Sequence, residues 1–299
     1  MDAPVAKLHD ALAIQLPSNS PNFILSTKKV IECVFNNGYI RNMIGFFIKK
    51  AFFDGWDNLL GIIVQNLIYI VLLLCAIGSF MVSSYSVYLS IALLAVVIFV
   101  FSIALGGTAA VVKNYSNYER ETWSAFAEGV KNNFAHSMLF FGIILFLVLL
   151  ATFILPFYLA MNNMMTIILA VVLMWLFVII LLALPYYFPL MNLLPGDKPL
   201  KTFKKCFIIV SDNFLFTLFY LLYNTVVVAF SVLVMGIMPG VAGYMLGAED
   251  AIKLLMFKYD YLEEHPDTDR HRIPWDELLY DEKEKVGPRS LKSMIFPWK

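Results

Sequence analysis

The sequence predicts an all-α, polytopic helical membrane protein with about six transmembrane helices, arranged as three hairpins with amphipathic interfacial helices. Of the 299 residues, 60% are hydrophobic and 15% are charged, whereas soluble domains average about half apolar and about a quarter charged residues. The mean hydropathy of +0.75 also favours a membrane protein. A net charge of zero offers no basic surface for nucleic acid. The lipid bilayer is therefore the expected partner, and nucleic acid is not.

Apolar runs of about 20 residues, the length that crosses the hydrocarbon core of a bilayer, divide the chain. A further stretch, 240–257, begins apolar but contains Glu249, Asp250 and Lys253. We expect this stretch to be a short returning sixth helix, with its charged residues near the cytoplasmic half. The five regular spans are predicted at 58–81, 88–112, 138–159, 165–194 and 213–238.

The basic residues predict the orientation of the spans. Six Lys and Arg precede the first span, three lie in 113–137, four lie in 198–212 and nine follow the fifth span. The two tight turns, 83–87 and 160–164, have none. Because cytoplasmic segments carry the excess of Lys and Arg, we expect both termini in the cytoplasm and an even number of spans. With no signal-peptide pattern at its start, the chain is predicted to be a multi-pass protein of the cell inner (cytoplasmic) membrane.

The chain divides into three predicted regions: a cytoplasmic N-terminal segment with an interfacial helix (1–45), a six-helix membrane bundle (46–258) and a cytoplasmic polar tail (259–299). Around the first boundary, apolar clusters alternate with lysines, which we expect to reach lipid headgroups. In the tail, 275–280 is predicted to form a short helix. The apolar group within 290–299 favours either renewed contact with the membrane or binding to a partner protein.

A repeated pattern precedes several spans. Residues 123–134 form an amphipathic segment that leads directly into an apolar run, and 203–214 repeat this pattern eighty positions later. Residues 48–59 are a weaker third copy. The repeat predicts three similar units, each made of an amphipathic segment, a polar corner and a helical hairpin.

The corner of each unit is an asparagine: Asn58, Asn133 and Asn213. Asparagine side chains at a helix N-terminus accept hydrogen bonds from amides that lack an intrahelical partner. We therefore expect each corner to cap the first turn of its span. Ten positions before the corner, Trp123 and Phe203 are expected to anchor two of the units at the headgroup level.

Small residues recur at a spacing of four near the sixth stretch, a pattern that lets the backbones of two helices approach closely. This pattern predicts helix packing within the bundle, with packing between two copies of the chain as the alternative. The patch at Gly106 and Gly107 is interpreted in the same way. The predicted packing residues near the sixth stretch are Gly236, Gly240, Gly243 and Gly247.

The sequence offers no catalytic motif. It contains no phosphate-binding loop, no His-Glu-x-x-His and no nucleophile elbow. The four histidines are scattered and are expected to face water or headgroups, and the three cysteines show no Cys-x-x-Cys spacing. We therefore predict no catalytic residues, no metal site and no cofactor. The histidines are His9, His136, His265 and His271.

Polar residues inside spans are costly, and so they are candidates for function. Six residues form this set: Gln65, Asn66, Asn224, Glu249, Asp250 and Lys253. The functional interpretation is the lining of a solute path or a contact with a partner. The structural alternative is interhelical hydrogen bonding for the amides. Glu249 and Lys253 lie four positions apart, so their structural alternative is one ion pair on the surface of the last helix.

The order of these parts resembles the YesL-like family of bacterial integral membrane proteins, known chiefly as a domain of unknown function. The resemblance covers roughly 46–258 and implies a six-span protein without an established activity, often encoded beside carbohydrate uptake and degradation genes. The N-terminal segment and the C-terminal tail depart from the family. The matching motifs are 57–72 with its Gln65-Asn66 pair, 105–110, 126–134, 184–189 and 238–243.

Two functions from different classes follow from this pattern. The first is a non-enzymatic accessory or structural component of a transport or envelope-associated membrane complex, in contact with a membrane-protein partner through its cytoplasmic helices or the tail 263–299. The second is a small-solute transporter or channel that uses the polar groups of the last helix. An enzyme acting on lipid would require polar side chains that converge at one depth.

Overall fold

The computed structural model describes residues 38–161, 163–265 and 273–289. The predictions for most of the N-terminal segment and for 290–299 lie outside this part of the chain. The described part is helical and has no strand, and five of its helical segments are long and apolar enough to cross a membrane. The chain is therefore a polytopic helical membrane protein. The five segments are Leu59–Ser84, Val87–Ser116, Phe134–Ala160, Met164–Leu193 and Phe214–Leu233.

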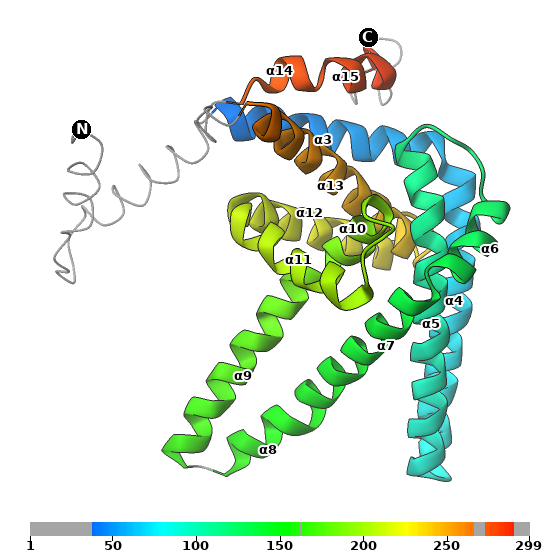
Figure 1. The fold of residues 1–299 in the computed structure, drawn as a ribbon. Helices are drawn as coiled ribbons and strands as arrows, with labels where there is room; N and C mark the ends of the chain where they lie inside the picture. The colour runs from blue at the N-terminus through cyan, green and yellow to red at the C-terminus, as the bar shows by residue number, and fades with distance from the viewer. Residues whose placement is uncertain (1–37, 162, 266–272, 290–299) are drawn as a thin grey trace, which may run out of the picture.

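Four of these segments form two hairpins, which diverge as they leave the rest of the molecule (Figure 1). The two hairpins therefore meet only at one end, whereas one six-helix bundle was predicted over 46–258. Across the five segments, only 17–28% of the most apolar window is buried, so most of each window's surface is left for lipid. The first hairpin is α4 (Leu59–Met81), η1 (Val82–Ser84) and α5 (Val87–Ser116); the second is α7 (Phe134–Leu149), η2 (Leu150–Ile154), α8 (Leu155–Ala160) and α9 (Met164–Ala183).

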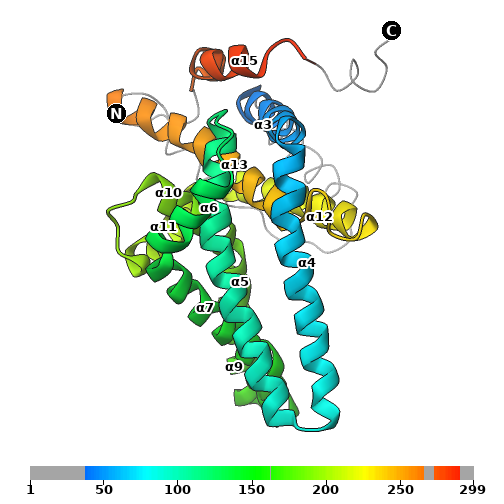
Figure 2. The ribbon, with the colours of Figure 1, turned by 90° about the vertical axis from the view of Figure 1, so that its right-hand side faces the viewer.

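The remaining helices, apart from α12, gather at one end of the hairpins and form a layer that we call the cap (Figures 1 and 2). The two charge-free turns lie at the opposite end, as the distribution of basic residues predicts. The described parts of both chain ends lie in the cap. Its helices are α3 (Gly38–Asp57), α6 (Trp123–Asn132), η3 (Leu184–Tyr186), α10 (Tyr187–Leu193), α11 (Pro199–Asp212), α13 (Gly240–Glu264), α14 (Trp275–Leu278) and α15 (Tyr280–Val286).

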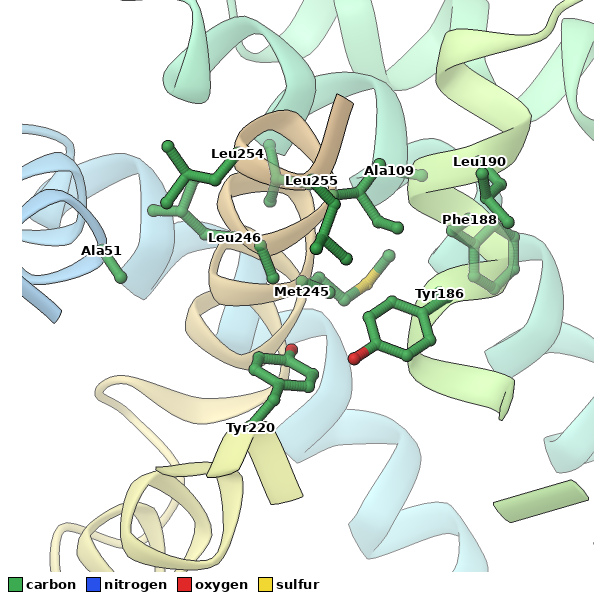
Figure 3. Close-up of a cluster of buried hydrophobic side chains, with 14 of the residues drawn as sticks. Ala51, Ala109, Tyr186, Phe188, Leu190, Tyr220, Met245, Leu246, Leu254 and Leu255 are labelled. Carbon is green, nitrogen blue, oxygen red and sulfur yellow. The ribbon is translucent and has the colours of Figure 1, made fainter. Parts of the chain in front are cut away.

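The third predicted hairpin has a different arrangement. Helix α12 (Phe214–Leu233) runs across the direction of α4 and α5 in both views (Figures 1 and 2). Helix α13, expected as a returning sixth span, is not among the five segments that could cross a membrane. It packs against α3, α4, α5 and α12, and Figure 3 shows apolar side chains from several of these helices around it. Helix α13 is the central helix of the cap.

The three Asn corners lie where the repeat predicts them, but the predicted capping bond is absent. Asn58, Asn133 and Asn213 directly precede α4, α7 and α12, and none accepts a capping hydrogen bond. Each donates its side-chain amide to a backbone carbonyl instead, Asn133 to that of Gly106 at 2.8 Å and Asn58 to that of Asp54 at 2.9 Å. The corners therefore tie the new span to the preceding helix or to a neighbouring helix.

The two predicted aromatic anchors differ from each other. Trp123, at the start of α6, is 63% exposed, as an anchor requires. Phe203 on α11 is half-buried and packs edge-on against Phe207 and Tyr187. The anchor prediction is therefore wrong for Phe203, because η3 and α10 fold back over α11 and bring Tyr187 to it.

The four glycines predicted to pack helices have three different roles. Gly236 and Gly240 lie at the turn between α12 and α13, where φ values of 77° and 59° favour glycine. A Cβ atom on Gly243 would meet Pro239 of its own turn at 2.4 Å. Two of the four face another helix closely: a Cβ atom on Gly240 would meet Asn66 of α4 at 2.4 Å, and one on Gly247 would meet Tyr223 of α12 at 3.2 Å. Gly240 and Gly247 therefore lie at close contacts between helices, whereas Gly243 packs within its own turn.

Candidate functional site

Six residues from four segments meet inside the cap, and we call them the charge cluster: Lys50, Asp54, Tyr118, Asp250, Lys253 and Glu282. Lys50 and Asp54 come from α3, and Tyr118 follows the end of α5. Asp250 and Lys253 come from α13, and Glu282 from α15. The cluster joins the first described helix to the last.

Lys50 is the centre of the cluster, and its side chain is 0% exposed. Its Nζ atom donates to Asp54 Oδ2 at 2.5 Å and to the Ser116 carbonyl at 3.1 Å. Asp250 Oδ1 and Glu282 Oε2 each lie 3.4 Å from the same nitrogen. The predicted placement of lysines in this region at the headgroups is therefore wrong for Lys50, which is buried inside the cap with carboxylates around it.

The carbonyl at the end of α5 explains why two lysines converge there. The last carbonyls of a helix have no intrahelical donor and carry partial negative charge, so a cation is stabilising beside them. The Ser116 carbonyl accepts from Lys50 at 3.1 Å and from Lys253 at 2.9 Å. The C-terminus of a membrane helix is thereby satisfied inside the protein by α3 and α13.

The lysines of the cluster affect the pKa values of its carboxyl groups to different extents. Burial and the nearby Asp250 carboxylate raise the pKa of Asp54 to about 8, against the attraction of Lys50. Burial also opposes ionisation of Glu282, but Lys50 and Lys253 outweigh it and hold the pKa of Glu282 below its usual range. A protonated Asp54 would leave two lysines facing two carboxylates near neutral pH, which makes the cluster electrically balanced.

Tyr118 lies among these charges in a conformation that few non-glycine residues adopt. Its φ angle is 65°, in the left-handed region that costs energy for residues with a Cβ atom. Its hydroxyl donates to Glu282 Oε2 at 3.0 Å and accepts from Lys50 at 3.3 Å. Its ring lies 4.6 Å from the ammonium group of Lys50, within the range of a cation–π contact. These contacts offset the strain at Tyr118.

Glu249 lies beside the cluster but makes separate contacts. It accepts a hydrogen bond from Asn192 of α10 at 2.9 Å, and the same amide group of Asn192 donates to the Ala109 carbonyl. Lys253 pairs with Glu282 at 3.3 Å. The predicted surface ion pair between Glu249 and Lys253 is therefore wrong, because α13 is enclosed by other helices and its neighbours supply the partners.

We expect Glu249→Gln to stabilise the protein near neutral pH. Burial raises the pKa of Glu249 to about 8, above the value near 4.5 expected in the unfolded chain, so the folded state retains a proton. Stability from this group is full below about pH 4.5 and is lost as the pH rises towards 8. The variant should gain about 2 kcal/mol at pH 7.5 and show a flatter pH profile. Thermal unfolding in detergent between pH 5 and pH 9 measures both effects.

Glu264→Gln is the matched control, because Glu264 lies exposed on the same helix. That variant should follow the pH profile of the unmodified protein. An unchanged profile for Glu249→Gln would contradict the assignment of a proton to Glu249.

The three amide side chains proposed as functional candidates lie at separate places in the structure. Gln65 Oε1 accepts from Thr108 at 3.0 Å, within the first hairpin. Asn66 bonds the turn that begins α13, with its Nδ2 atom 2.7 Å from the Pro239 carbonyl and its Oδ1 atom 2.9 Å from the Ala242 amide. Asn224 lines a cavity beside α12. These residues do not form one path.

Four members of the cluster were not among the predicted candidates: Lys50, Asp54, Tyr118 and Glu282. One signal for two of them was present in the sequence. Lys50 and Asp54 lie four positions apart, the spacing of an ion pair on one helix face, and aromatic residues surround them on α3. Tyr118 and Glu282 lie in polar stretches, where nothing local distinguishes a buried residue from an exposed one.

The tail is packed onto α3 and is less independent than predicted. The short helix expected at 275–280 is present as α14 and the start of α15. Arg289 forms a two-atom contact with the Asp57 carboxylate at 2.8 and 2.9 Å, and Lys49 donates to the Gly287 carbonyl at 2.8 Å. The region boundaries at 45 and 258 fall inside α3 and α13.

The histidine prediction is wrong for His136. Its side chain is buried, and Nδ1 lies 3.2 Å from the hydroxyl of Tyr187. His265 is exposed at the end of α13 and stacks on Tyr261. Within the described residues, no group of three or more His, Cys, Asp or Glu is arranged to hold a metal ion.

The fold and the site together define a polytopic helical membrane protein with an ionic network in its cap. The chain matches no family model, no curated protein and no solved structure. The resemblance to the YesL-like family therefore stays a prediction.

Proposed function

We propose that the protein is a non-enzymatic component of a membrane complex and binds a membrane-protein partner through the cap. The observation that carries this proposal is a groove of about 800 Å³ between α3 and the C-terminal helices α14 and α15. Helices α3, α14 and α15, which line the groove, lie on the side of the cap away from the hairpins (Figure 1). A partner would therefore reach it from the aqueous side of the membrane.

The chemistry of the groove suits a segment with both polar and apolar side chains. Tyr280 on its wall is 66% exposed, and Phe46 lies buried at its base. Exposed aromatic residues are enriched where proteins bind each other. The wall also carries two lysines and two carboxylates, so neither sign of charge dominates. The groove residues are Gly45, Phe46, Lys49, Asp276, Tyr280, Lys283, Glu284, Gly287 and Pro288.

The alternative, a transporter or channel, has less support from the described residues. A solute path would need a hollow that reaches Glu249 and Asp250. Two hollows stand out in the described part of the chain, and neither is lined by these residues. Their carboxylates instead hold Asn192, Ser116 and Lys50 in place.

Photo-crosslinking in native membranes tests the proposed partner contact. The photoreactive residue p-benzoylphenylalanine replaces Tyr280, an aromatic-for-aromatic exchange that keeps the wall of the groove. The matched control places it at Tyr85, which is 91% exposed in the turn at the far end of the first hairpin. We expect a discrete protein adduct from position 280 and none of the same mass from position 85.

The result that would overturn the proposal is equally specific. If position 280 yields only lipid adducts or none, the cap does not bind a protein there. Solute flux in liposomes that contain only this chain, abolished by Asp250→Asn, would establish the transporter alternative.

A further inference from the structure

We propose that the cavity beside Asn224 binds a neutral, lipid-soluble molecule that carries a hydroxyl group on an apolar body. The cavity has a volume of about 290 Å³ and lies between α9, η3, α12 and α13. This inference does not rest on the proposed partner contact. Its polar wall residues are Thr217, Tyr220, Asn224, Thr225 and Tyr244.

The first argument is an unpaired polar atom inside the cavity wall. Asn224 is 5% exposed, and its Oδ1 atom has no hydrogen-bond partner among the described residues. A buried amide oxygen without a donor is costly, and buried polar atoms in native proteins nearly always have partners. A bound hydroxyl group would supply the missing donor. Because a hydroxyl both donates and accepts, it would pair with the Asn224 amide in either orientation of that group.

Three of the other polar side chains of the wall are already in use, which makes the Asn224 amide oxygen the buried recognition point. The Thr217 hydroxyl pairs with Tyr186 at 3.0 Å, and the Thr225 hydroxyl donates to the Leu221 carbonyl of its own helix at 2.9 Å. The Tyr220 hydroxyl donates to the Tyr244 carbonyl at 3.5 Å. A ligand would therefore meet the free Asn224 oxygen, and beside it the Tyr244 hydroxyl, in a largely apolar wall, the pattern of a small-molecule site.

The second argument concerns the route by which a ligand would enter the cavity. Leu181 of α9 and Leu221 and Val228 of α12 line the cavity and are also exposed on the apolar surface of the helices. That surface is the part of the molecule that faces lipid. The ligand would therefore enter from the bilayer, which excludes sugars and ions and favours a molecule that partitions into hydrocarbon.

The volume limits the size of the bound part. At about 30 Å³ for each water-sized group, the cavity holds about ten such groups, the size of a ten-carbon alcohol. A longer chain would leave its end in the bilayer. The binding mode that follows has the hydroxyl on Asn224 and the chain running outward past Val228.

The test uses two diazirine probes in liposomes that contain the full chain: a photoreactive 1-decanol and the matching decane without a hydroxyl group. Labelled peptides are identified by mass spectrometry. We expect the alcohol to label residues of α9 and α12 at the cavity about five to ten times more than the decane, a preference that one buried hydrogen bond supplies. Asn224→Leu, of similar size, should abolish the preference, and Thr225→Val should retain it.

Two further results make the test decisive. Val228→Phe should fill the mouth and reduce labelling by both probes at least fivefold, whereas Leu60→Phe, on the exposed side of α4, should leave labelling unchanged. The proposal is overturned if the two probes label the unmodified protein equally, or if the alcohol preference persists in Asn224→Leu.

Discussion

Replacement of Lys50 by Met should cost about 3 to 5 kcal/mol of folding free energy, the loss typical of removing one partner from a buried ionic network. Lys50 is the only cation in direct contact with Asp54 and Asp250 among the described residues. Methionine fills a similar volume but leaves these carboxylates buried without their cation. Thermal unfolding in detergent measures the loss, and limited proteolysis should show earlier cleavage at α15, since Glu282 also loses a contact.

Lys49→Met is the matched control for this prediction. Lys49 is adjacent and half-buried, and it makes a single hydrogen bond to the Gly287 carbonyl. Its replacement should cost less than about 1 kcal/mol. The deficit of Lys50→Met should also grow as the pH rises above about 8, because Asp54 then loses its proton beside Lys50 in the unmodified protein but has no cation in the variant. Equal losses for the two lysine variants would show that the cluster contributes little to stability.

The hairpins were predictable because their signals are local. An apolar run of about 20 residues, a charge-free turn and an Asn corner each lie within a short stretch of chain, and the first two hairpins and all three corners were found in place. The direction of the corner hydrogen bonds was not predictable. The amide of Asn133 donates to Gly106, a partner that only the packing of α5 on α6 and α7 brings near.

Hydropathy alone could not decide whether α13 crosses the membrane or lies buried in the cap. A stretch that is apolar with three charged residues fits a short span, and it fits equally a helix buried in a protein cap. The difference depends on the partners of its charged groups, which come from α3, α5, α10 and α15. For the same reason hydropathy could not place Asp250 beside Lys50 of α3, and the contacts first expected for Glu249 and Lys253 were wrong.

The turn between α12 and α13 depends on a single side chain from α4. Asn66 is fully buried and makes three hydrogen bonds, donating to the carbonyls of Ile237 and Pro239 and accepting from the Ala242 amide. Asn66→Leu would leave these three backbone groups without partners, at a cost of about 3 kcal/mol or more. Since this turn starts α13, the variant should unfold at lower temperature in detergent, with the cap lost first.

Gln65→Leu distinguishes this role from a general effect of removing a buried amide. Gln65 is the next residue, it is also fully buried, and its Nε2 atom has no partner among the described residues. Its one hydrogen bond comes from Thr108, whose own hydroxyl also accepts from Tyr69. The control should therefore change stability by less than about 1 kcal/mol, because removal of an unpaired donor offsets the lost bond. If both variants lose stability to the same extent, Asn66 is not the residue that holds the turn.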